Sequence, residues 1–575
     1  MNAPIGNRNH QSSIRKSSVF SLQSKILTLV ALVAAGVFLF VRSLPPQPRA
    51  FDAPGWDALA ARTVGGAYHI HTTRSDGLGD RAAVAAAAAR AGLKFAILTD
   101  HGDGTRPPDP PEYIDGVLVL DGVEISTDEG HYVAIDMPRA PYPLGGAAEA
   151  VVEDVRRLGG FGIAAHPDSP KATLRWTDDR APIDGVEWLN TDSEWRGESR
   201  LKLLRAGLAY FLRPGPAMAT LFDRPRTLGR WDQLTRFRPV VALAATDAHG
   251  GVGRRAEDTG RSLAGTIGMP SYEASFRAFS NRVILDRPLS GNAAADGRAV
   301  YDAIRKGRVF TAIDAIAGPA LLDFYVEAGL EQLVMGGQMP DDSDVTIVAR
   351  SVVPPGGELV LLRDGREVTK GRDWVRRTVT EARGAYRVEV RLPGAPGSPP
   401  MPWLVSNPAY FLSDAEGAKG AEGAAGATGA RPIPPFPWRI EKDPSSSGIL
   451  RTREHEVTFE YRLGDGPRNS QFVALATDPG PQVYGTIELS LAGDRPLRAS
   501  IQIRGKDGGR WGRSYYVDPA GSLLRVPLAS LRPIGGAGSV PPSTEVTSIL
   551  VVVDLTNAAP GRAGVLRVRS SALIN

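Results

Sequence analysis

Residues 66–71 read Gly66-Ala67-Tyr68-His69-Ile70-His71, and Asp76 follows shortly after them. Side chains alternate between the two faces of a β-strand, so the two histidines of this apolar run are expected to point the same way. Both imidazoles can then reach one metal ion, and the turn-like Ser75-Asp76-Gly77 can bring a carboxylate back over the same strand end. The stretch therefore predicts a strand that ends in a metal site.

The histidines of this chain are concentrated around that stretch. Six of the eight lie between residues 69 and 249, and His10 and His455 lie outside this region. Packing needs alone do not explain such a concentration. The chain has no cysteine, which excludes disulfides, thiolate metal ligands and cysteine nucleophiles. Any bound metal must therefore be held by imidazole and carboxylate groups.

From residue 63 to about residue 285 the sequence alternates between strand-like and helix-like segments. Such alternation predicts parallel strands joined by crossover helices, in a doubly wound sheet or a barrel. The polar candidates follow the carboxyl ends of the strands, which is where α/β folds place their chemistry. The strand-like runs are 67–71, 95–99, 117–124, 132–135, 161–165, 186–189 and 240–245, and the helix-like runs are 80–91, 149–158 and 201–212.

Two candidate ligands follow the second and third strand-like runs. His101 comes after residues 95–99 and is expected to face the site, because neighbours in a strand face opposite ways. Asp100 would then orient an imidazole from behind, or it would cap a helix. Glu124 ends the apolar run 117–123, where a carboxylate is costly unless it is paired or bound to metal. We therefore predict His101 and Glu124 as metal ligands.

Three further candidates lie later in the chain. His166 follows an apolar strand and precedes a proline, which marks a sharp strand exit, and it is predicted as a ligand. Asp247 and His249 repeat the one-apart spacing and can share a face if the preceding strand persists. His131 comes seven residues after Glu124, and its role as a ligand or as a hydrogen-bonded structural histidine stays open.

Taken in order, these residues resemble the motifs of the polymerase and histidinol phosphatase (PHP) superfamily. The resemblance covers about residues 63–285, and the ordered set is more specific than any single motif. The step from Glu124 to Gly130-His131 and the downstream segment 402–408 look most like the carbaryl-hydrolase-like branch of that superfamily. The motifs are His69-Ile70-His71, Ser75-Asp76-Gly77, Thr99-Asp100-His101, Gly122-Val123-Glu124, His166-Pro167 and Asp247-Ala248-His249.

This resemblance implies a distorted (β/α)7 barrel that holds two or three divalent metal ions, for which imidazole and carboxylate ligands suit zinc, manganese or iron. Many relatives have a histidine where this chain has Asp76, which implies a weaker third site. By resemblance, the first ion would be held by His69, His71, Glu124 and Asp247, the second by Glu124, His166 and His131, and the third by Asp76, His101 and His249.

Bound ions would lower the pKa of water, so a hydroxide that bridges two of them would be available near neutral pH to attack phosphorus or a carbonyl carbon. We predict Glu124, Asp247 and His166 as the residues that carry catalysis. Glu187 and Asn190 close a further strand and could line the pocket, pack, or support a ligand. Four basic residues near the motifs could bind an anion or be solvated surface charges, namely Arg74, Lys171, Arg175 and Arg254.

The N-terminal segment, residues 1–50, is expected to target the chain to the membrane. Its apolar run 26–41 is slightly short for a bilayer span and slightly long for the core of a signal peptide. Prolines follow this run in place of a small-residue cleavage site, so we favour an uncleaved signal anchor, with a secreted, cleaved form as the alternative. The distribution of basic residues places the N-terminus in the cytoplasm and the catalytic part in the periplasm or outside the cell.

Three regions follow the α/β part. Residues 300–412 are expected to form an accessory β-sandwich that begins with a short helix at 302–307 and has a hairpin turn at Asp364-Gly365. Residues 413–438 are expected to be a linker rich in glycine, alanine and proline, because glycine recurs at every third position before a proline-rich end.

Residues 439–575 loosely resemble a galactose-binding-like jelly roll. In such a domain Trp511, Tyr515 and Tyr516 could form a platform on which carbohydrate stacks, or they could pack the sandwich. The chain as a whole is therefore expected to combine α/β and all-β parts.

Composition narrows the classes of function. The chain has 67 basic and 63 acidic residues, and the net charge of +4 gives no reason to expect nucleic acid as a partner. The first hypothesis is a membrane-anchored, extracytoplasmic, metal-dependent hydrolase of small phosphoesters, or alternatively of carbamates or carboxylic esters. The second is a non-catalytic surface protein that binds carbohydrate through its C-terminal domain. Because every motif position holds a plausible ligand, we favour the enzyme.

Overall fold

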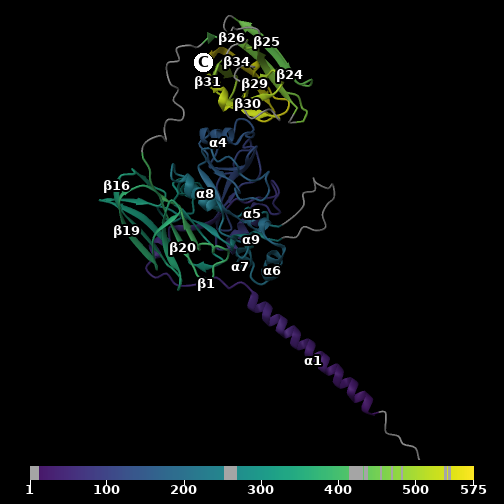
Figure 1. Ribbon diagram of the computed structural model, residues 1–575, viewed down its shortest axis with the longest axis vertical. Coiled ribbons are helices and arrows are strands. Elements are labelled where there is room, and N and C mark those ends of the chain that lie inside the picture. The colour runs from purple at the N-terminus through teal and green to yellow at the C-terminus, as the bar shows by residue number, and fades with distance from the viewer. Residues whose placement is uncertain are drawn as a thin grey trace, which may run out of the picture.

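The computed structural model describes residues 12–251, 269–413, 431–432, 438–453, 456–467, 470–480, 484–535, 541 and 546–574. Its first half mixes helices and strands, and its second half is rich in β-sheet (Figure 1). The expected combination of α/β and all-β parts is confirmed at this level. Arg254 and the glycine triplets of the 413–438 segment lie outside the described residues.

One 16-stranded sheet runs through most of the first 411 residues. Three of its strands branch from the main path, and they are β4 (Glu112–Ile114), β17 (Glu358–Arg363) and β18 (Arg366–Gly371). The main path, in hydrogen-bonded order, is β15 (Gln338–Met339), β22 (Ala409–Phe411), β20 (Gly384–Arg391), β21 (Leu404–Ser406), β11 (Val309–Ala312), β10 (Ser280–Ile284), β2 (Thr63–Tyr68), β3 (Phe95–Leu98), β5 (Val117–Thr127), β6 (Gly130–Ile135), β7 (Phe161–Ala164), β8 (Gly185–Asn190) and β9 (Val241–Ala245).

The strands of this sheet do not all run parallel. Parallel pairs join β2 to β3, β3 to β5, β7 to β8 and β8 to β9, whereas β6 is antiparallel to both of its neighbours. The reason is the two-residue connection between β5 and β6, which is too short for a parallel crossover. The segments that follow β2 and β9 meet through an isolated parallel bridge between Ile70 and Ala248. The seven-stranded barrel therefore stays a prediction.

Helices cover both faces of the sheet and give it two apolar layers. On β3, Phe95 and Ile97 pack in one cluster with Val300 and Ile304, while Ala96 and Leu98 pack in another with Val84 and Ala88. This period of two matches the alternation of side chains along a strand. The helices of this part are α2 (Asp57–Ala60), α3 (Arg81–Arg90), α4 (Ala148–Arg157), α5 (Thr191–Gly197), α6 (Arg200–Tyr210), α7 (Pro214–Ala219), α8 (Thr227–Leu234), α9 (Tyr272–Phe276) and α10 (Ala293–Arg305).

Helix α10 is longer than the sequence pattern indicates. A helix was expected at 302–307, but α10 begins after Asn292, whose side chain caps it by accepting a hydrogen bond from the backbone NH of Ala295. Gly297 interrupts the apolar pattern, so the sequence does not indicate the first turns of α10. A Cβ at Gly297 would lie 3.0 Å from Leu120 and from Pro111, so the glycine allows close packing on the sheet.

The segment after α10 extends the main sheet and adds a second layer. Strand β11 pairs antiparallel with β10 and β21, which joins this segment directly to the α/β part. Buried residues of both parts belong to one hydrophobic cluster. The second layer is a four-stranded sheet made of β14 (Glu331–Val334), β13 (Leu322–Ala328), β16 (Ser343–Ser351) and β19 (Trp374–Ala382). A separate two-stranded parallel sheet joins residues near the N-terminal helix to this region through β1 (Arg49–Ala50) and β12 (Ala317–Gly318).

The C-terminal part consists of two six-stranded sheets that enclose a separate apolar cluster. The first sheet contains β23 (Arg431–Pro432), β25 (Ser447–Arg453), β26 (Glu456–Arg462), β34 (Ala563–Ile574), β28 (Thr486–Gly493) and β31 (Ser522–Pro527). The second contains β24 (Arg439–Lys442), β27 (Phe472–Thr477), β33 (Val546–Asp554), β29 (Leu497–Gly505), β30 (Arg510–Val517) and β32 (Arg532–Ile534), and a short 3₁₀-helix spans Leu528–Ser530.

The three aromatic residues that could form a carbohydrate platform have packing roles instead. Trp511 is buried in the apolar cluster between the two sheets, and Tyr515 packs against the same cluster. The ring of Tyr516 lies 3.6 Å from the guanidinium of Arg157, on helix α4 of the α/β part. The second of the two alternatives, packing, therefore describes these side chains.

The C-terminal part lies beside helix α4 of the α/β part (Figure 1), and a buried ion pair joins the two. Arg498 of β29 lies 2.8 Å from Asp154, and both side chains are 1 % exposed. Arg498 also donates a hydrogen bond to the backbone carbonyl of Ala150 and contacts Glu153 at 2.8 Å. Because α4 packs on β6 and β7, this contact links the C-terminal part to the strand that carries His131 and to the strand that leads to His166.

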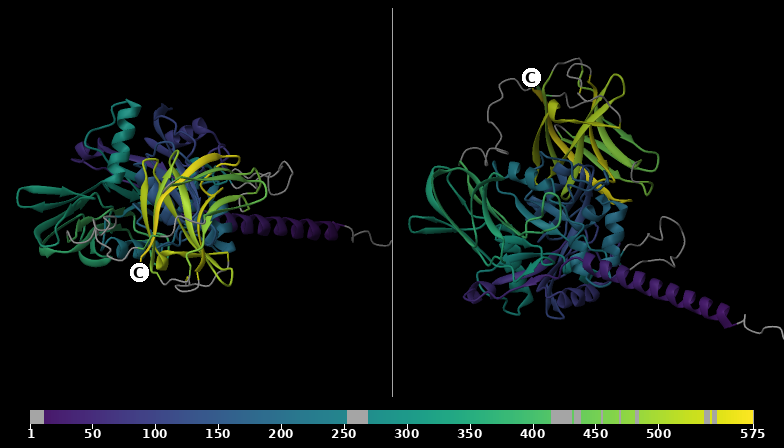
Figure 2. Two further views of the ribbon diagram at one scale, coloured as in Figure 1. Left: turned by 90° about the horizontal axis from the view of Figure 1, so that it is seen from above. Right: turned by 60° about the horizontal axis from the view of Figure 1, so that its bottom comes forward.

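The N-terminal helix α1 (Ser12–Ser43) projects away from the rest of the molecule (Figures 1 and 2). Its stretch Ser24–Ser43 has a mean hydropathy of 2.3, and none of it is buried. By length and composition this stretch could cross a membrane, either as a signal anchor or as a signal peptide.

Candidate metal centre

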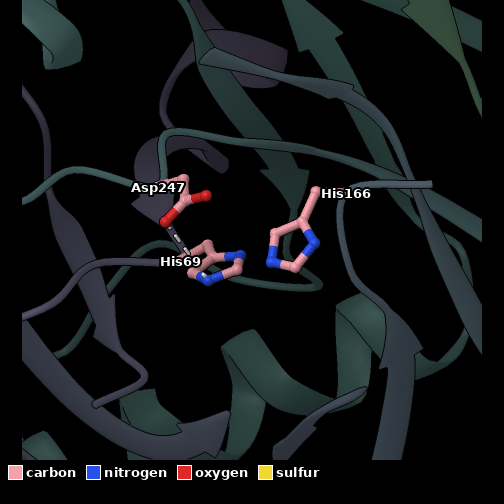
Figure 3. Close-up of side chains that lie close together, drawn as sticks. All are labelled: His69, His166 and Asp247. Atoms are coloured by element: carbon pink, nitrogen blue, oxygen red, sulfur yellow. Dashed lines mark ion pairs between the residues drawn. The ribbon is translucent and has the colours of Figure 1, made fainter. Parts of the chain in front are cut away.

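Three residues of the site have left-handed backbone conformations just after their strands end. Their φ angles are 63° at His69, 32° at His166 and 45° at Asp247. Each such conformation costs about 1–3 kcal/mol in a residue that has a Cβ, and strain of this kind is concentrated at functional sites. Figure 3 shows the three side chains gathered from separate segments of the chain.

These turns change the reason why the paired histidines converge. The sequence pattern predicted a strand through His71, but β2 ends at Tyr68, and β9 ends at Ala245 before Asp247 and His249. The one-apart pairs therefore do not share the face of a persisting strand. They converge because the backbone turns at His69 and at Asp247 and directs the side chains into one space.

An inner group of side chains brings two imidazole nitrogens against two carboxylate oxygens. The Nε2 atoms of His69 and His71 each lie 3.2 Å from Oε2 of Glu124, and they lie 3.6 Å and 3.3 Å from Oδ1 of Asp247. Four ligands at about 2.0–2.2 Å from a tetrahedral zinc ion would be about 3.3–3.6 Å apart. Both Nε2 atoms are buried and have no hydrogen-bond partner within the described residues. The donor set therefore fits a divalent cation.

Glu124 connects this inner group to two more histidines. Its second oxygen, Oε1, lies 2.7 Å from Nδ1 of His131 and 2.8 Å from Nε2 of His166. Nδ1 of His166 lies 3.0 Å from the carbonyl oxygen of Leu174 and donates to it, so Nε2 is the nitrogen that faces Glu124 and could bind a cation. Glu124 is 1 % exposed and has its two oxygens in two different donor groups.

An outer group surrounds Asp76 at the solvent side of the cluster. Oδ2 of Asp76 lies 3.5 Å from Nε2 of His101 and 3.4 Å from Nε2 of His249, and Oδ1 lies 3.3 Å from Nδ1 of His71. The side chains of Asp76, His101 and His249 are 26 %, 30 % and 25 % exposed, whereas the inner side chains are buried. The structure thus gathers all nine predicted site residues in one cluster, with the outer group accessible to solvent.

Glu187 has a closer relation to the site than the sequence indicated. Its Oε1 lies 2.5 Å from Nδ1 of His69, and its Oε2 accepts hydrogen bonds from the backbone NH of His166 and from Asn190. Asn190 also donates to Asp247 at 3.3 Å. The signal in the sequence is a carboxylate within the apolar strand β8, which is the same argument that identified Glu124.

The hydrogen bonds of Asp100 differ from both of its predicted roles, which were to orient an imidazole or to cap a helix. It accepts hydrogen bonds from the backbone NH and the hydroxyl of Thr72 and from the hydroxyl of Ser75. These bonds fix the turn that carries Asp76. The helix cap is at Asp80, which accepts from Ala83 at the start of α3. Strand alternation indicated on which side of the strand Asp100 would point, but it gave no information about the turn of residues 72–75 that donates hydrogen bonds to it.

The basic residues near the motifs are engaged or peripheral. Arg74 forms an ion pair with Asp109, and Arg175 donates to the backbone carbonyl of Ser169. Lys171 is exposed. For Arg74, Lys171 and Arg175, the predicted role as surface charges therefore agrees better with the structure than a dedicated anion site does.

The buried carboxylates favour the protonated form of the imidazole beside them. Burial lowers the pKa of His71, but the carboxylates of Asp247 and Glu124 outweigh burial and raise that pKa to about 10. Burial raises the pKa of Glu124, yet His69, His131 and His166 hold it well below its usual range. A cation that binds these imidazoles must displace their protons, so metal binding is expected to release protons.

Removing the charge of Glu187 is expected to weaken metal binding. Glu187 orients His69 and increases its basicity as a ligand, and changes at such supporting residues typically lower metal affinity by about 10–100-fold. We expect Glu187→Gln to show a loss of this size when zinc or manganese is titrated against a competing chelator. The control is Glu112→Gln, at a side chain that is 60 % exposed. An affinity equal to that of the control would contradict a supporting role for Glu187.

Comparisons with known proteins add a few distant similarities. No family model matches the chain, and no curated protein matches it. Among solved structures, a two-domain protein containing a predicted PHP-like metal-dependent phosphoesterase from Bacteroides vulgatus is 13 % identical, covers 63 % of this chain and 99 % of its own, and has a TM-score of 0.27. The family 11 carbohydrate-binding module from Clostridium thermocellum is 13 % identical, covers 26 % of this chain and 98 % of its own, and has a TM-score of 0.22.

Proposed function

We propose that the chain is a metal-dependent hydrolase of the PHP type that acts on phosphoesters. The observation that carries this proposal is the shared carboxylate of Glu124, whose two oxygens face two different groups of imidazoles. The Nε2 atoms of His69 and His71 support it, because both are buried, form no hydrogen bond within the described residues and face two carboxylates, as ligands of one cation would. The PHP barrel, the zinc, manganese or iron content and the nine ligand roles belong to this proposal.

The predicted ligands would hold three ions at different depths in the cluster. His69, His71, Glu124 and Asp247 would hold the first ion, Glu124 with His131 and His166 the second, and Asp76, His101 and His249 the third. When bound, the ions supply Lewis acidity and lower the pKa of water. Glu187 and Leu174 fix the tautomers of His69 and His166, and the strained turns hold the donors in place before substrate binds.

The substrate would bind at the outer side of the cluster. A cavity of about 360 Å³ lies beside His101 and is partly lined by Arg74, Arg106 and Met137. Arg106 lies 2.6 Å from Asp121, and Arg74 pairs with Asp109, so the positive charge of this cavity is largely compensated. An uncharged leaving group fits this environment better than a second phosphate does. The same feature favours the alternative reaction, hydrolysis of a carbamate or carboxylic ester.

The location and the carbohydrate partner are further parts of this proposal. Helix α1 would anchor the chain in the membrane, with the hydrolase on the extracytoplasmic side. A non-catalytic protein that binds carbohydrate through residues 439–574 is the competing hypothesis, and it would have to use a surface other than Trp511.

The test is metal content and hydrolysis by the purified full chain. We expect two or three ions per chain and turnover of p-nitrophenyl phosphate or bis(p-nitrophenyl) phosphate, with p-nitrophenyl acetate and a p-nitrophenyl carbamate as the alternative substrates. Both signals should be lost in His69→Ala and Asp247→Ala and kept in Asp286→Ala, at a surface side chain that is 84 % exposed. A folded chain that takes up no zinc, manganese or iron would rule out the hydrolase.

A further inference from the structure

Helix α6 has an apolar stripe on its solvent side. The spacing of these residues places them within an arc of about 100° on one face of a helix and its C-terminal cap. The opposite face of α6, with Ala206 and Ala209, is buried against the protein. The exposed fractions are 57 % for Leu201, 59 % for Leu204, 51 % for Leu208, 75 % for Phe211 and 59 % for Leu212.

Basic side chains border the stripe. On the helix, Arg200 lies at one edge of the stripe and Arg205 at the other, and both are exposed. Long cationic side chains at the edges of an apolar face are typical of helices that lie in the plane of a membrane surface, where they reach lipid phosphates. Exposed apolar side chains that adjoin one another and are bordered by polar residues mark protein or membrane interaction sites.

The stripe lies next to the end of α1. A cleft between the two helices is lined by Leu39, Phe40 and Ser43 on one side and by Arg205 and Leu208 on the other. Arg213, just after α6, donates to the backbone carbonyl of Pro45, which follows α1. Figure 1 shows α6 at the end of the body from which α1 departs. The apolar span of α1 therefore leads directly to the apolar stripe of α6.

We propose that α6 lies on the surface of an anionic lipid bilayer, with Leu201, Leu204, Leu208, Phe211 and Leu212 in the interfacial region. This proposal rests on the crossing of that bilayer by α1, which is part of the proposed function. The continuity of the two apolar surfaces favours lipid as the occupant. A second copy fits less well, because a symmetric contact through this stripe would bring Arg200 and Arg205 near their own counterparts. Contact at α6 would hold the hydrolase in one orientation above the membrane, rather than leave it free on a single anchor.

Because the chain has no cysteine, a single label can report on this contact. The full chain with Leu208→Cys would be labelled with an environment-sensitive fluorophore and reconstituted in vesicles of phosphatidylcholine and phosphatidylglycerol. The matched control is Leu330→Cys, an exposed leucine between β13 and β14. Strands β16 and β19 of the same four-stranded sheet lie away from α1 (Figure 1).

An interfacial helix lies about 5–10 Å into the boundary between headgroups and acyl chains, so a lipid quencher near the headgroup should quench the Leu208 label more strongly than one at the chain end. The Leu330 label should respond to aqueous iodide only. Adding Leu204→Glu to the Leu208→Cys chain should increase iodide quenching of its label several-fold, toward the level of the Leu330→Cys control.

Three results would overturn this proposal. Equal iodide quenching at both labels would show that α6 faces water, and protection of the Leu208 label from both lipid quencher and iodide would show that protein covers the stripe. A chain that does not float with the vesicles would remove the anchor itself. None of these measurements depends on bound metal or on hydrolysis, so they can fail while the proposed hydrolase stands.

Discussion

Replacing Glu124 with glutamine is expected to abolish metal binding at the two inner positions and to lower hydrolysis by at least about 10³-fold, because loss of Lewis acids removes several kcal/mol of transition-state stabilisation. The amide keeps the shape of the side chain. It cannot present two anionic oxygens, and its NH₂ group would face imidazoles that must act as ligands. Glu124 Oε2 lies 3.2 Å from both His69 and His71, and Oε1 lies within 2.8 Å of His131 and His166.

Metal analysis of the purified chain after dialysis, together with kcat/KM, would measure this effect. Glu124→Asp is the informative companion, because it keeps the charge but shortens the reach, and we expect it to retain part of the metal and part of the activity. Asp286→Asn, at an exposed side chain, should match the unmodified chain. If Glu124→Gln bound the same number of ions with the same affinity, Glu124 would not be the shared ligand, and the proposed arrangement of ions would be wrong.

The gathering of the site could be anticipated because its signals are local. A histidine, aspartate or glutamate at the end of an apolar run is costly to bury without a purpose, and the ends of neighbouring strands meet at one edge of a sheet. His69, His71, Glu124 and Asp247 were identified in this way, and the structure brings them together. Their roles as ligands stay a prediction until metal is measured.

Other features depend on contacts between distant segments, and the sequence pattern did not contain them. Strand alternation gave a wrong account of the turns at His69 and Asp247, since a left-handed residue is selected by its surroundings rather than by its neighbours in sequence. Glu187 could be seen as a buried carboxylate, but its partner His69 lies 118 positions away in the sequence. In the same way, the packing of Trp511 and Tyr516 follows from the assembled sandwich and its contact with α4.

The largest effect on stability is expected at Arg387, on β20. Its side chain is 2 % exposed, and its guanidinium forms two hydrogen bonds with Asp232 of α8, at 2.7 Å and 2.9 Å, and one with Glu389 at 2.8 Å. Burial raises the pKa of Glu389, but Arg387 and Arg224 outweigh burial and lower that pKa to about 2, so this carboxylate is ionised at neutral pH. The network joins the 309–411 segment to the α/β part that contains the metal centre.

Arg387→Met should destabilise the chain by about 3–5 kcal/mol, because removing one member of a buried ion pair leaves the other charge without a partner. Unfolding followed by calorimetry and by tryptophan fluorescence would measure the loss. The matched control is Arg350→Met, which removes an arginine paired with Asp323 at a side chain that is 54 % exposed, and surface pairs of this kind contribute about 1 kcal/mol or less.

The double variant Arg387→Met/Asp232→Leu separates the charge network from simple packing. Replacing both members of a buried pair by apolar residues is often neutral, so the double variant should recover much of the stability that Arg387→Met loses. Arg224 and Arg391 remain as partners for Glu389 in both variants. If the double variant were less stable than Arg387→Met, the alkyl and stacking contacts of Arg387 with its neighbours, including Trp231 at 5.4 Å, would outweigh the stranded charge of Asp232.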